Sequence, residues 1–244
     1  GGTASRLYTF IIDSNTTIYG GFYGDEARLE QRNPALYETI LSGNLGDTSI
    51  ATDNAYHVMT ILNATKNSLI DGFTIKDGRS DGGFTQSAYL QRGAAVRLAY
   101  DSTLPGRPTF KNCIFANNVA ANGGAIHLSQ YFKSNAKTNF LKCSFINNSS
   151  FDNGSGNRGG ALYIDAGYAS NGTIGTVYLA MDSCVFDGNA SYNGGAIYND
   201  ADYAGKIEYA ITNTIFRHNK NSSLSSGYGG AISNNTNSKG KLKL

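Results

Sequence analysis

The sequence contains no apolar run of about 18 residues, the length that a membrane-spanning helix requires, so we expect no membrane insertion of this region. Charged side chains are also scarce: they make up 16% of the 244 residues, whereas soluble domains usually reach about 25%. The net charge of +2 gives no reason to expect a nucleic acid or an anionic membrane as a partner. No stretch shows the i, i+3, i+4, i+7 apolar spacing of an amphipathic helix over three turns, which argues against a helical fold.

Cysteine is rare as well, with only Cys113, Cys143 and Cys184. Neither a Cys-x-x-Cys pair nor a His-rich stretch predicts a metal site. Each cysteine stands two residues before a phenylalanine, so we interpret the three as a buried ladder of small apolar side chains. A disulfide between adjacent rungs is the alternative, because rungs about 4.8 Å apart come close to the Cα separation of a disulfide. We expect no cofactor; calcium is the one candidate, and no motif indicates it.

The most prominent feature of the sequence is a heptapeptide with a glycine pair, which recurs along the chain. Residues 122–128 read Asn-Gly-Gly-Ala-Ile-His-Leu, and the pattern returns at 158–164, 193–199 and 228–234, with a degenerate copy at 93–98. The first glycines, at positions 93, 123, 159, 194 and 229, are 30, 36, 35 and 35 residues apart. A fixed period of this size is typical of a solenoid in which each repeat stacks on its neighbour.

A second motif, Cys-x-Phe-x-x-Asn, precedes the glycine pairs. It occupies 113–118, 143–148 and 184–189, and Thr214 replaces the cysteine in the copy at 214–219. Residues two apart in a strand share a face, so the Cys and Phe side chains should form two inward stacks. The Asn that ends each motif should lie at a bend, where asparagine tolerates unusual backbone angles, and its side chain can bond those of neighbouring coils.

Short segments rich in β-branched and aromatic residues, such as 177–181 and 207–211, are bounded by Gly, Asn, Asp and Ser, which is typical of strands. Each coil should therefore contain a strand before the Cys-Phe strand, the Cys-Phe strand itself and the Gly-Gly-Ala strand. The expected fold is all-β: a right-handed parallel β-helix (solenoid) of about five to six coils, three strands per coil and an N-terminal capping segment. We expect one continuous domain, with residues 1–54 forming the cap and leading strands and residues 55–244 the regular coils.

The alternating motifs F-x-x-N and G-G-A-[ILV] resemble the repeats of polymorphic outer-membrane proteins. Residues 18–22, the region of Arg32 and residues 39–44 are similar to the first segment of secreted bacterial β-helix proteins of the pectin-lyase-like superfamily. These resemblances imply a passenger or adhesin-like role, secreted or at the cell surface, with the bacterial outer surface as the expected location. They imply no particular activity, because a fold alone does not give a function.

One tyrosine recurs seven to nine positions after the first glycine in four of the five copies. These residues are Tyr100, Tyr131, Tyr168 and Tyr203. One tyrosine per coil would form a ladder at one corner, and aromatic faces beside polar groups bind sugar rings. We take this ladder as the candidate glycan-binding strip, with simple packing of the rings on the loop bases as the alternative. A second, weaker strip comprises His127, Tyr163 and Tyr198.

Enzymes of this fold class cut polysaccharides with paired carboxylates or with a basic residue beside calcium. The aspartates that follow the Gly-Gly-Ala strands are Asp101, Asp165, Asp200 and Asp202. They could align on one face, but aspartates in turns more often cap backbone groups. The three histidines, at positions 57, 127 and 218, match no nucleophile, base or zinc motif. We therefore name no catalytic and no metal-binding residue.

Three functions remain open. The favoured one is a non-catalytic extracellular or cell-surface β-helix for adhesin-like display or glycan binding, with a polysaccharide or a host cell-surface glycan as partner. The second is a polysaccharide lyase or glycoside hydrolase that acts on a surface groove, and the third is a structural stalk or spacer. The abrupt start at Gly1-Gly2-Thr3 suggests a fragment, so we expect a monomer or part of a larger surface protein.

Overall fold

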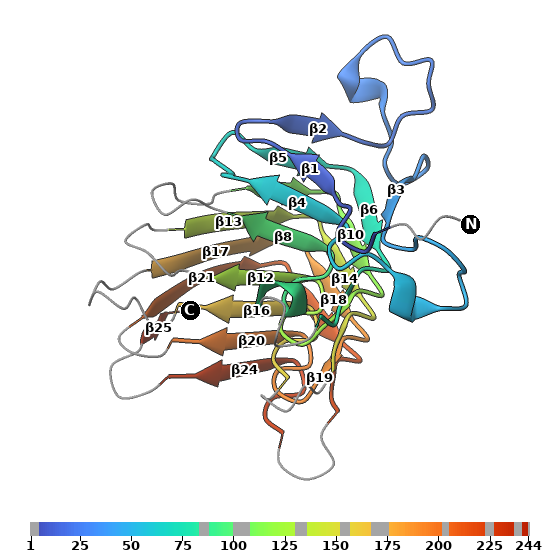
Figure 1. Cartoon of the computed structure of the whole chain (residues 1–244). Helices are drawn as coiled ribbons and strands as arrows, with labels where there is room; N and C mark the ends of the chain where they lie inside the picture. Colours follow the sequence, from blue (N-terminus) through green and yellow to red (C-terminus); the bar gives the residue numbers. More distant parts are fainter. Residues whose placement is uncertain are drawn as a thin grey trace.

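The computed structural model describes residues 5–82, 88–99, 108–129, 136–151, 157–166, 176–201, 205–222, 227–236 and 241–243. Its strands form four parallel sheets that wind around a common interior (Figure 1). Helical structure in the described residues is limited to three 3₁₀ turns, η1 (Leu29–Gln31), η2 (Ala51–Asp53) and η3 (Ala88–Gln91). None of the helices in this described part is long and apolar enough to cross a bilayer. The predicted right-handed parallel β-helix is confirmed.

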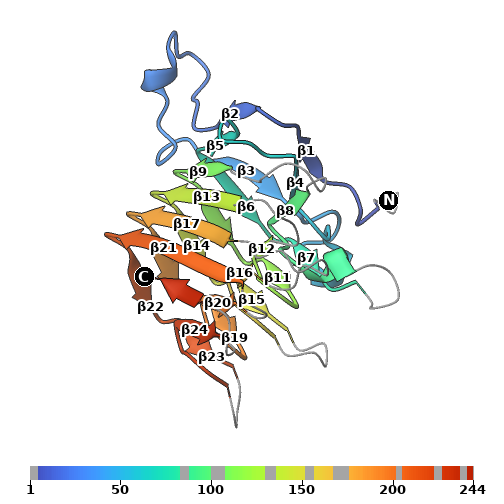
Figure 2. The same ribbon diagram turned by 90° about the vertical axis from the view of Figure 1, so that its left-hand side faces the viewer.

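Each sheet takes one strand from successive coils. Sheet A contains β1 (Phe10–Ile12), β4 (Met59–Leu62), β8 (Val96–Ala99), β12 (Ile126–Ser129), β16 (Leu162–Asp165), β20 (Ile197–Asp200) and β24 (Ile232–Asn235). Sheet B contains β2 (Thr17–Tyr19), β5 (Leu69–Asp71), β9 (Thr109–Lys111), β13 (Ala136–Leu141), β17 (Thr176–Asp182), β21 (Lys206–Thr212) and β25 (Lys241–Lys243). Figure 2 shows β9, β13, β17 and β21 stacked in chain order.

The Cys-Phe strands form sheet C, and a fourth sheet follows it. Sheet C contains β3 (Thr39–Ser42), β6 (Phe73–Lys76), β10 (Ile114–Ala116), β14 (Ser144–Ile146), β18 (Val185–Asp187) and β22 (Ile215–Arg217). Sheet D contains the two-residue strands β7 (Arg79–Ser80), β11 (Val119–Ala120), β15 (Ser149–Ser150), β19 (Ala190–Ser191) and β23 (Lys220–Asn221). Three strands per coil were expected, and sheet D adds a short fourth one.

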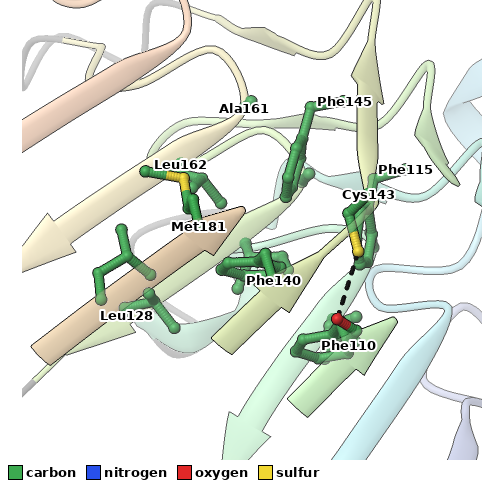
Figure 3. Close-up of a cluster of buried hydrophobic side chains, with 14 of the residues drawn as sticks. Phe110, Phe115, Leu128, Phe140, Cys143, Phe145, Ala161, Leu162 and Met181 are labelled. Atoms are coloured by element: carbon green, nitrogen blue, oxygen red, sulfur yellow. Dashed lines mark hydrogen bonds between the residues drawn. The ribbon is translucent and has the colours of Figure 1, made fainter. Parts of the chain in front are cut away.

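Two stacks of phenylalanine rings fill the interior (Figure 3). The rings of Phe115 and Phe145 are 4.8 Å apart, and those of Phe145 and Phe186 are 4.5 Å apart with only 4° between their planes. Phe110 and Phe140 form a parallel stack at 5.3 Å, which meets the first stack edge to face. The inward stacking that the Cys-x-Phe motif predicts is therefore present.

The three cysteines form the predicted buried ladder and are all free thiols. Each lies at the corner directly before its sheet C strand, and each Sγ donates to a carbonyl oxygen of the coil before it. Figure 3 shows the bond from Cys143 Sγ to Phe110 O, which is 3.4 Å long. The equivalent bonds of Cys113 to Ile70 O and of Cys184 to Phe140 O have the same length. The alternative of a disulfide between rungs is not realised.

The asparagines that end the F-x-x-N motif form a hydrogen-bonded ladder. Asn118 Nδ2 donates to Asn148 Oδ1 at 3.0 Å, and Asn148 Nδ2 donates to Asn189 Oδ1 at 3.1 Å. Asn148 Nδ2 also donates to Phe115 O at 2.8 Å, while Asn148 Oδ1 accepts from the backbone N–H of Asn118 at 3.1 Å. The predicted contact between asparagines of neighbouring coils is confirmed, and these side chains satisfy buried backbone groups.

The left-handed backbone lies one residue earlier than the motif predicts. Asn117 and Asn147, which precede the ladder asparagines, have φ values of 56° and 52°. The ladder asparagine is instead held by its side-chain bonds inside the coil. The corner before sheet C also begins with left-handed residues, since Asn112 and Lys142 have φ values of 49° and 53°. Asparagine adopts the left-handed backbone conformation at a lower energetic cost than most residues.

The first coil is formed by residues before the regular repeat. Strands β1, β2 and β3 pair in parallel with β4, β5 and β6, and residues 20–38 extend from this coil around η1 (Figure 1). This segment is attached to the second coil by side-chain contacts of Arg32. The division of the chain at residue 54 stays a prediction.

Candidate ligand-binding face

The outer face of sheet A carries the variable side chains of the glycine-rich repeat. In β12 the side chains of Ile126 and Leu128 point into the core, so His127 between them points outward. The strand register places His127 beside Tyr163 and Tyr163 beside Tyr198. The rings of His127 and Tyr163 stack with centroids 4.7 Å apart, and those of Tyr163 and Tyr198 are 5.8 Å apart. We call these three residues the aromatic column.

A second column of polar residues follows the strand ends on the same face. Ser129 lies beside Asp165, Asp165 beside Asp200, and Asp200 beside Asn235. Adjacent parallel strands are about 4.8 Å apart, so two aspartates that the sequence placed after the Gly-Gly-Ala strands come to lie on neighbouring coils. The structure therefore brings together one carboxylate pair on sheet A.

Asp200 is held in a hydrogen-bonded cluster with the aromatic column. Tyr163 Oη donates to Asp200 Oδ2 at 3.2 Å, and Arg158 Nη1 lies 3.4 Å from the same oxygen. Asn235 Nδ2 donates to Asp200 Oδ1 at 3.0 Å, so both carboxylate oxygens are engaged. Burial raises the pKa of the Tyr163 hydroxyl, and the negative charges of Asp165 and Asp200 raise it further. Tyr163 therefore stays protonated and serves as a donor.

His127 is buried beside Asp165 without a hydrogen bond to it. Its Nε2 atom lies 3.8 Å from Asp165 Oδ2, and its side chain is 7% exposed. Burial lowers the pKa of His127; the carboxylate of Asp165 opposes this shift, and the positive charge of Arg92 adds to it. The imidazole is therefore neutral at pH 7, and its Nε2 has no hydrogen-bond partner among the described residues.

Connections on the two sides of sheet A vary in length, whereas the corners between sheets C and D do not. From sheet C to sheet D every connection has two residues, at 77–78, 117–118, 147–148, 188–189 and 218–219. The connections that enter sheet A are residues 43–58, 81–95, 121–125, 151–161, 192–196 and 222–231. Those that leave it are residues 13–16, 63–68, 100–108, 130–135, 166–175, 201–205 and 236–240. Variation in the connections is therefore concentrated beside sheet A.

The predicted glycan strip lies outside the part of the chain that the structure describes. Its members are Tyr100, Tyr131, Tyr168 and Tyr203. Asp101 and Asp202 also fall outside the described ranges. The four tyrosines belong to the connections that leave sheet A, and their role stays a prediction.

The second predicted strip does form a column, but not an open one. Tyr163 and Tyr198 are only 4% and 7% exposed, so their faces are not available for stacking on a sugar. The sequence analysis missed Arg158, whose guanidinium carbon lies 5.7 and 5.5 Å from the two ring centroids. A signal existed, because the residue before the first glycine alternates between arginine at 92 and 158 and asparagine at 122 and 193.

Metal ligation is not indicated at this face. Across the described ranges, no group of three or more His, Cys, Asp or Glu side chains is arranged to bind a metal ion. The cluster on sheet A is instead a set of mutually bonded polar and aromatic side chains. Such a cluster can fix the strands of neighbouring coils relative to one another and can present hydrogen-bonding groups at its edges.

Two segments of the chain, residues 112–129 and 183–200, match the Chlamydia polymorphic membrane protein (Chlamydia_PMP) repeat. Each segment extends from the corner before the Cys-Phe strand, through the ladder asparagine and the glycine pair, to the end of a sheet A strand. No curated protein and no solved structure gives a significant match. The chain is thus a parallel β-helix protein whose repeats are similar to those of polymorphic membrane proteins, and this similarity supports a bacterial surface location in broad terms.

Proposed function

We propose that this chain is a non-catalytic display module of a bacterial surface protein, with an adhesin-like role in which sheet A and its connections bind glycans. The supporting observation is the contrast between the corners of the coil. Those between sheets C and D have two residues throughout, whereas those beside sheet A range in length from four residues, at 13–16, to sixteen, at 43–58. Binding residues are disproportionately found on loops that a rigid scaffold positions. A rigid stacked core that carries connections of variable length beside one sheet fits this arrangement of scaffold and binding loops.

The carboxylates on sheet A favour a non-catalytic role. Asp200 accepts hydrogen bonds at both oxygens, from Tyr163 and from Asn235. A nucleophile or general acid needs an oxygen that can reach the substrate. The contacts of Asp200 are those of a structural residue.

A glycoside hydrolase is the second candidate, because Asp165 and Asp200 are register partners on neighbouring strands. Retaining glycosidases hold their two carboxyl groups about 5 to 5.5 Å apart, which is close to the spacing of adjacent strands, about 4.8 Å. The double variant Asp165→Asn/Asp200→Asn separates this candidate from display, since it would abolish hydrolysis and leave binding at the tyrosine connections intact.

A panel of neutral and acidic polysaccharides tests these functions, with retention scored by affinity electrophoresis and cleavage scored by new reducing or unsaturated ends. Retention without cleavage is the expected result. We also expect Tyr131→Ala and Tyr168→Ala to weaken retention without lowering the melting temperature, whereas Tyr8→Ala, at an exposed site in the first coil, should change neither. Cleavage that the double aspartate variant removes would establish the hydrolase, and the absence of any retention would favour a spacer.

A further inference from the structure

One arginine on the outer face of sheet A forms no ion pair with any carboxylate in the described part of the chain. Arg97 of β8 lies beside Thr60 of β4 and is half-buried. Its guanidinium carbon lies 4.2 Å from the centroid of the Tyr89 ring. Among the described residues, no carboxylate forms an ion pair with Arg97, in contrast to Arg158, which pairs with Asp200. A guanidinium that lies on an aromatic ring, with no ion-paired carboxylate in the described ranges, is suited to an anionic ligand.

A buried imidazole lies next to this pair. The rings of His57 and Tyr89 are 6.2 Å apart, and His57 is 5% exposed. His57 Nδ1 lies 3.0 Å from Gly93 O; a carbonyl oxygen only accepts, so Nδ1 carries the proton. Burial lowers the pKa of His57 to about 4; the hydrogen bond to Gly93 opposes this shift, and the charge of Arg97 adds to it. The ring is therefore neutral at pH 7, and its Nε2 has no hydrogen-bond partner among the described residues.

The aromatic column continues from this site. Val96 of β8 and Ile126 of β12 are register partners, and Arg97 and His127 follow them on the outer face of these neighbouring strands. His127 is also neutral at pH 7, because burial lowers its pKa. The positive charge at this end of sheet A therefore comes from Arg97, together with Arg92. The opposite end of the face carries Asp165 and Asp200.

We propose that Arg97 and Tyr89, with the neutral ring of His57 beside Tyr89, form a subsite for a carboxylated sugar, such as a terminal sialic or uronic acid on a cell-surface glycan. The guanidinium can donate two parallel hydrogen bonds to the carboxylate, and the exposed part of the Tyr89 ring can pack on the sugar ring. A neutral sugar leaves the donors of Arg97 unused, so the subsite selects for the acid. This inference rests on the proposed glycan-binding function.

The test uses isothermal titration calorimetry of the 244-residue chain at pH 7 and low ionic strength. The probes are 3′-sialyllactose, lactose, which lacks only the acidic sugar, and a disaccharide with a terminal glucuronic acid. At least one acidic probe should bind about tenfold more tightly than lactose. Arg97→Gln should reduce this preference to within about twofold, and Arg97→Lys, which keeps the charge but not the planar fork, should retain part of it. Added salt should weaken binding of the acidic probe.

Lys137→Gln is the matched control, because it removes one positive charge from an exposed position on sheet B and should leave the preference unchanged. Thermal melting of each variant checks that it is folded. Acidic probes that bind no more tightly than lactose, or a folded Arg97→Gln chain that binds them as well as the parent, would overturn the subsite but leave glycan binding elsewhere intact. Failure of the whole polysaccharide panel to bind would overturn the proposed function and the subsite together.

Discussion

Arg32 and Asp71 form a buried ion pair that holds the N-terminal segment against the second coil. Arg32 Nη2 lies 2.5 Å from Asp71 Oδ2, and the two side chains are 11% and 2% exposed. Arg32 Nη1 donates to Gly20 O at 3.0 Å, and Asn112 Nδ2 donates to Asp71 Oδ1 at 2.8 Å. The pair therefore links three consecutive coils, through the segment before β3, the end of β5 and the corner after β9.

Removal of the arginine should destabilise the protein strongly. In Arg32→Met, Asp71 stays buried with Lys111 Nζ, at 4.0 Å, as its remaining cation. Breaking a buried pair from one side costs about 3 to 5 kcal/mol, and we expect a loss of about 3 kcal/mol in the free energy of unfolding by urea. Arg217→Gln is the control, because Arg217 pairs with Asp187 on the surface and is 58% exposed. Equal losses in the two variants would contradict a special role for the buried pair.

The asparagine ladder should be more sensitive than an asparagine at the surface. Asn148→Ala removes bonds to Asn118, Asn189 and the carbonyl of Phe115, and it leaves buried polar groups unpaired. Each such group costs about 1 to 3 kcal/mol, so we expect a total loss of about 3 kcal/mol by urea denaturation. Asn139→Ala on the outer face of sheet B removes one bond, to Thr109, and should cost less than about 1 kcal/mol. A ladder variant as stable as the control would mean that water replaces the lost bonds.

The interior could be predicted from the sequence because every coil repeats it. Phe115 and Phe145 occupy the same place in successive copies of one motif, so the period of the repeat brings their rings together without knowledge of distant contacts. Sheet D could not be predicted in this way, since Val119–Ala120 and Ser149–Ser150 are too short to show an alternating pattern. No sequence pattern indicates the Arg32–Asp71 pair either, because its two residues belong to no shared motif.

The candidate site could be predicted only in part, because the repeat gives the position of a residue along the strands but not what surrounds its side chain. The repeat places His127, Tyr163 and Tyr198 in one column, and the register confirms this. Their burial depends on the side chains that surround the column, and periodicity carries no information about these. Arg97 and Tyr89 are brought together by η3, a segment without a counterpart in the described parts of the other coils.

The second glycine of the repeat should be essential inside the solenoid and dispensable in the last Gly-Gly-Ala copy. A Cβ on Gly160 would lie 2.1 Å from Gly195 O and 2.7 Å from the backbone of Ala190, whereas a Cβ on Gly230 would meet, among the described residues, only Asn219 O, at 3.7 Å. We therefore expect Gly160→Ala to cost about 3 kcal/mol or more, because two coils must move apart. Gly230→Ala, at the same position of the last copy, should be close to neutral. Urea denaturation of the two variants measures the difference, and similar losses would contradict a steric origin of the cost.

Stability should fall in acid because of His57. Its pKa is about 4 in the folded chain and about 6.5 in an unfolded one, so between these values the unfolded state binds more protons. Stability therefore decreases as the pH falls from about 6.5 to 4, by on the order of 3 kcal/mol from this residue. His57→Gln should flatten this part of the profile of unfolding free energy against pH, and His218→Gln, at an exposed site, should leave it unchanged. If the profile keeps its slope without His57, the acid sensitivity arises at another group, and His127 is the next to replace because burial lowers its pKa as well.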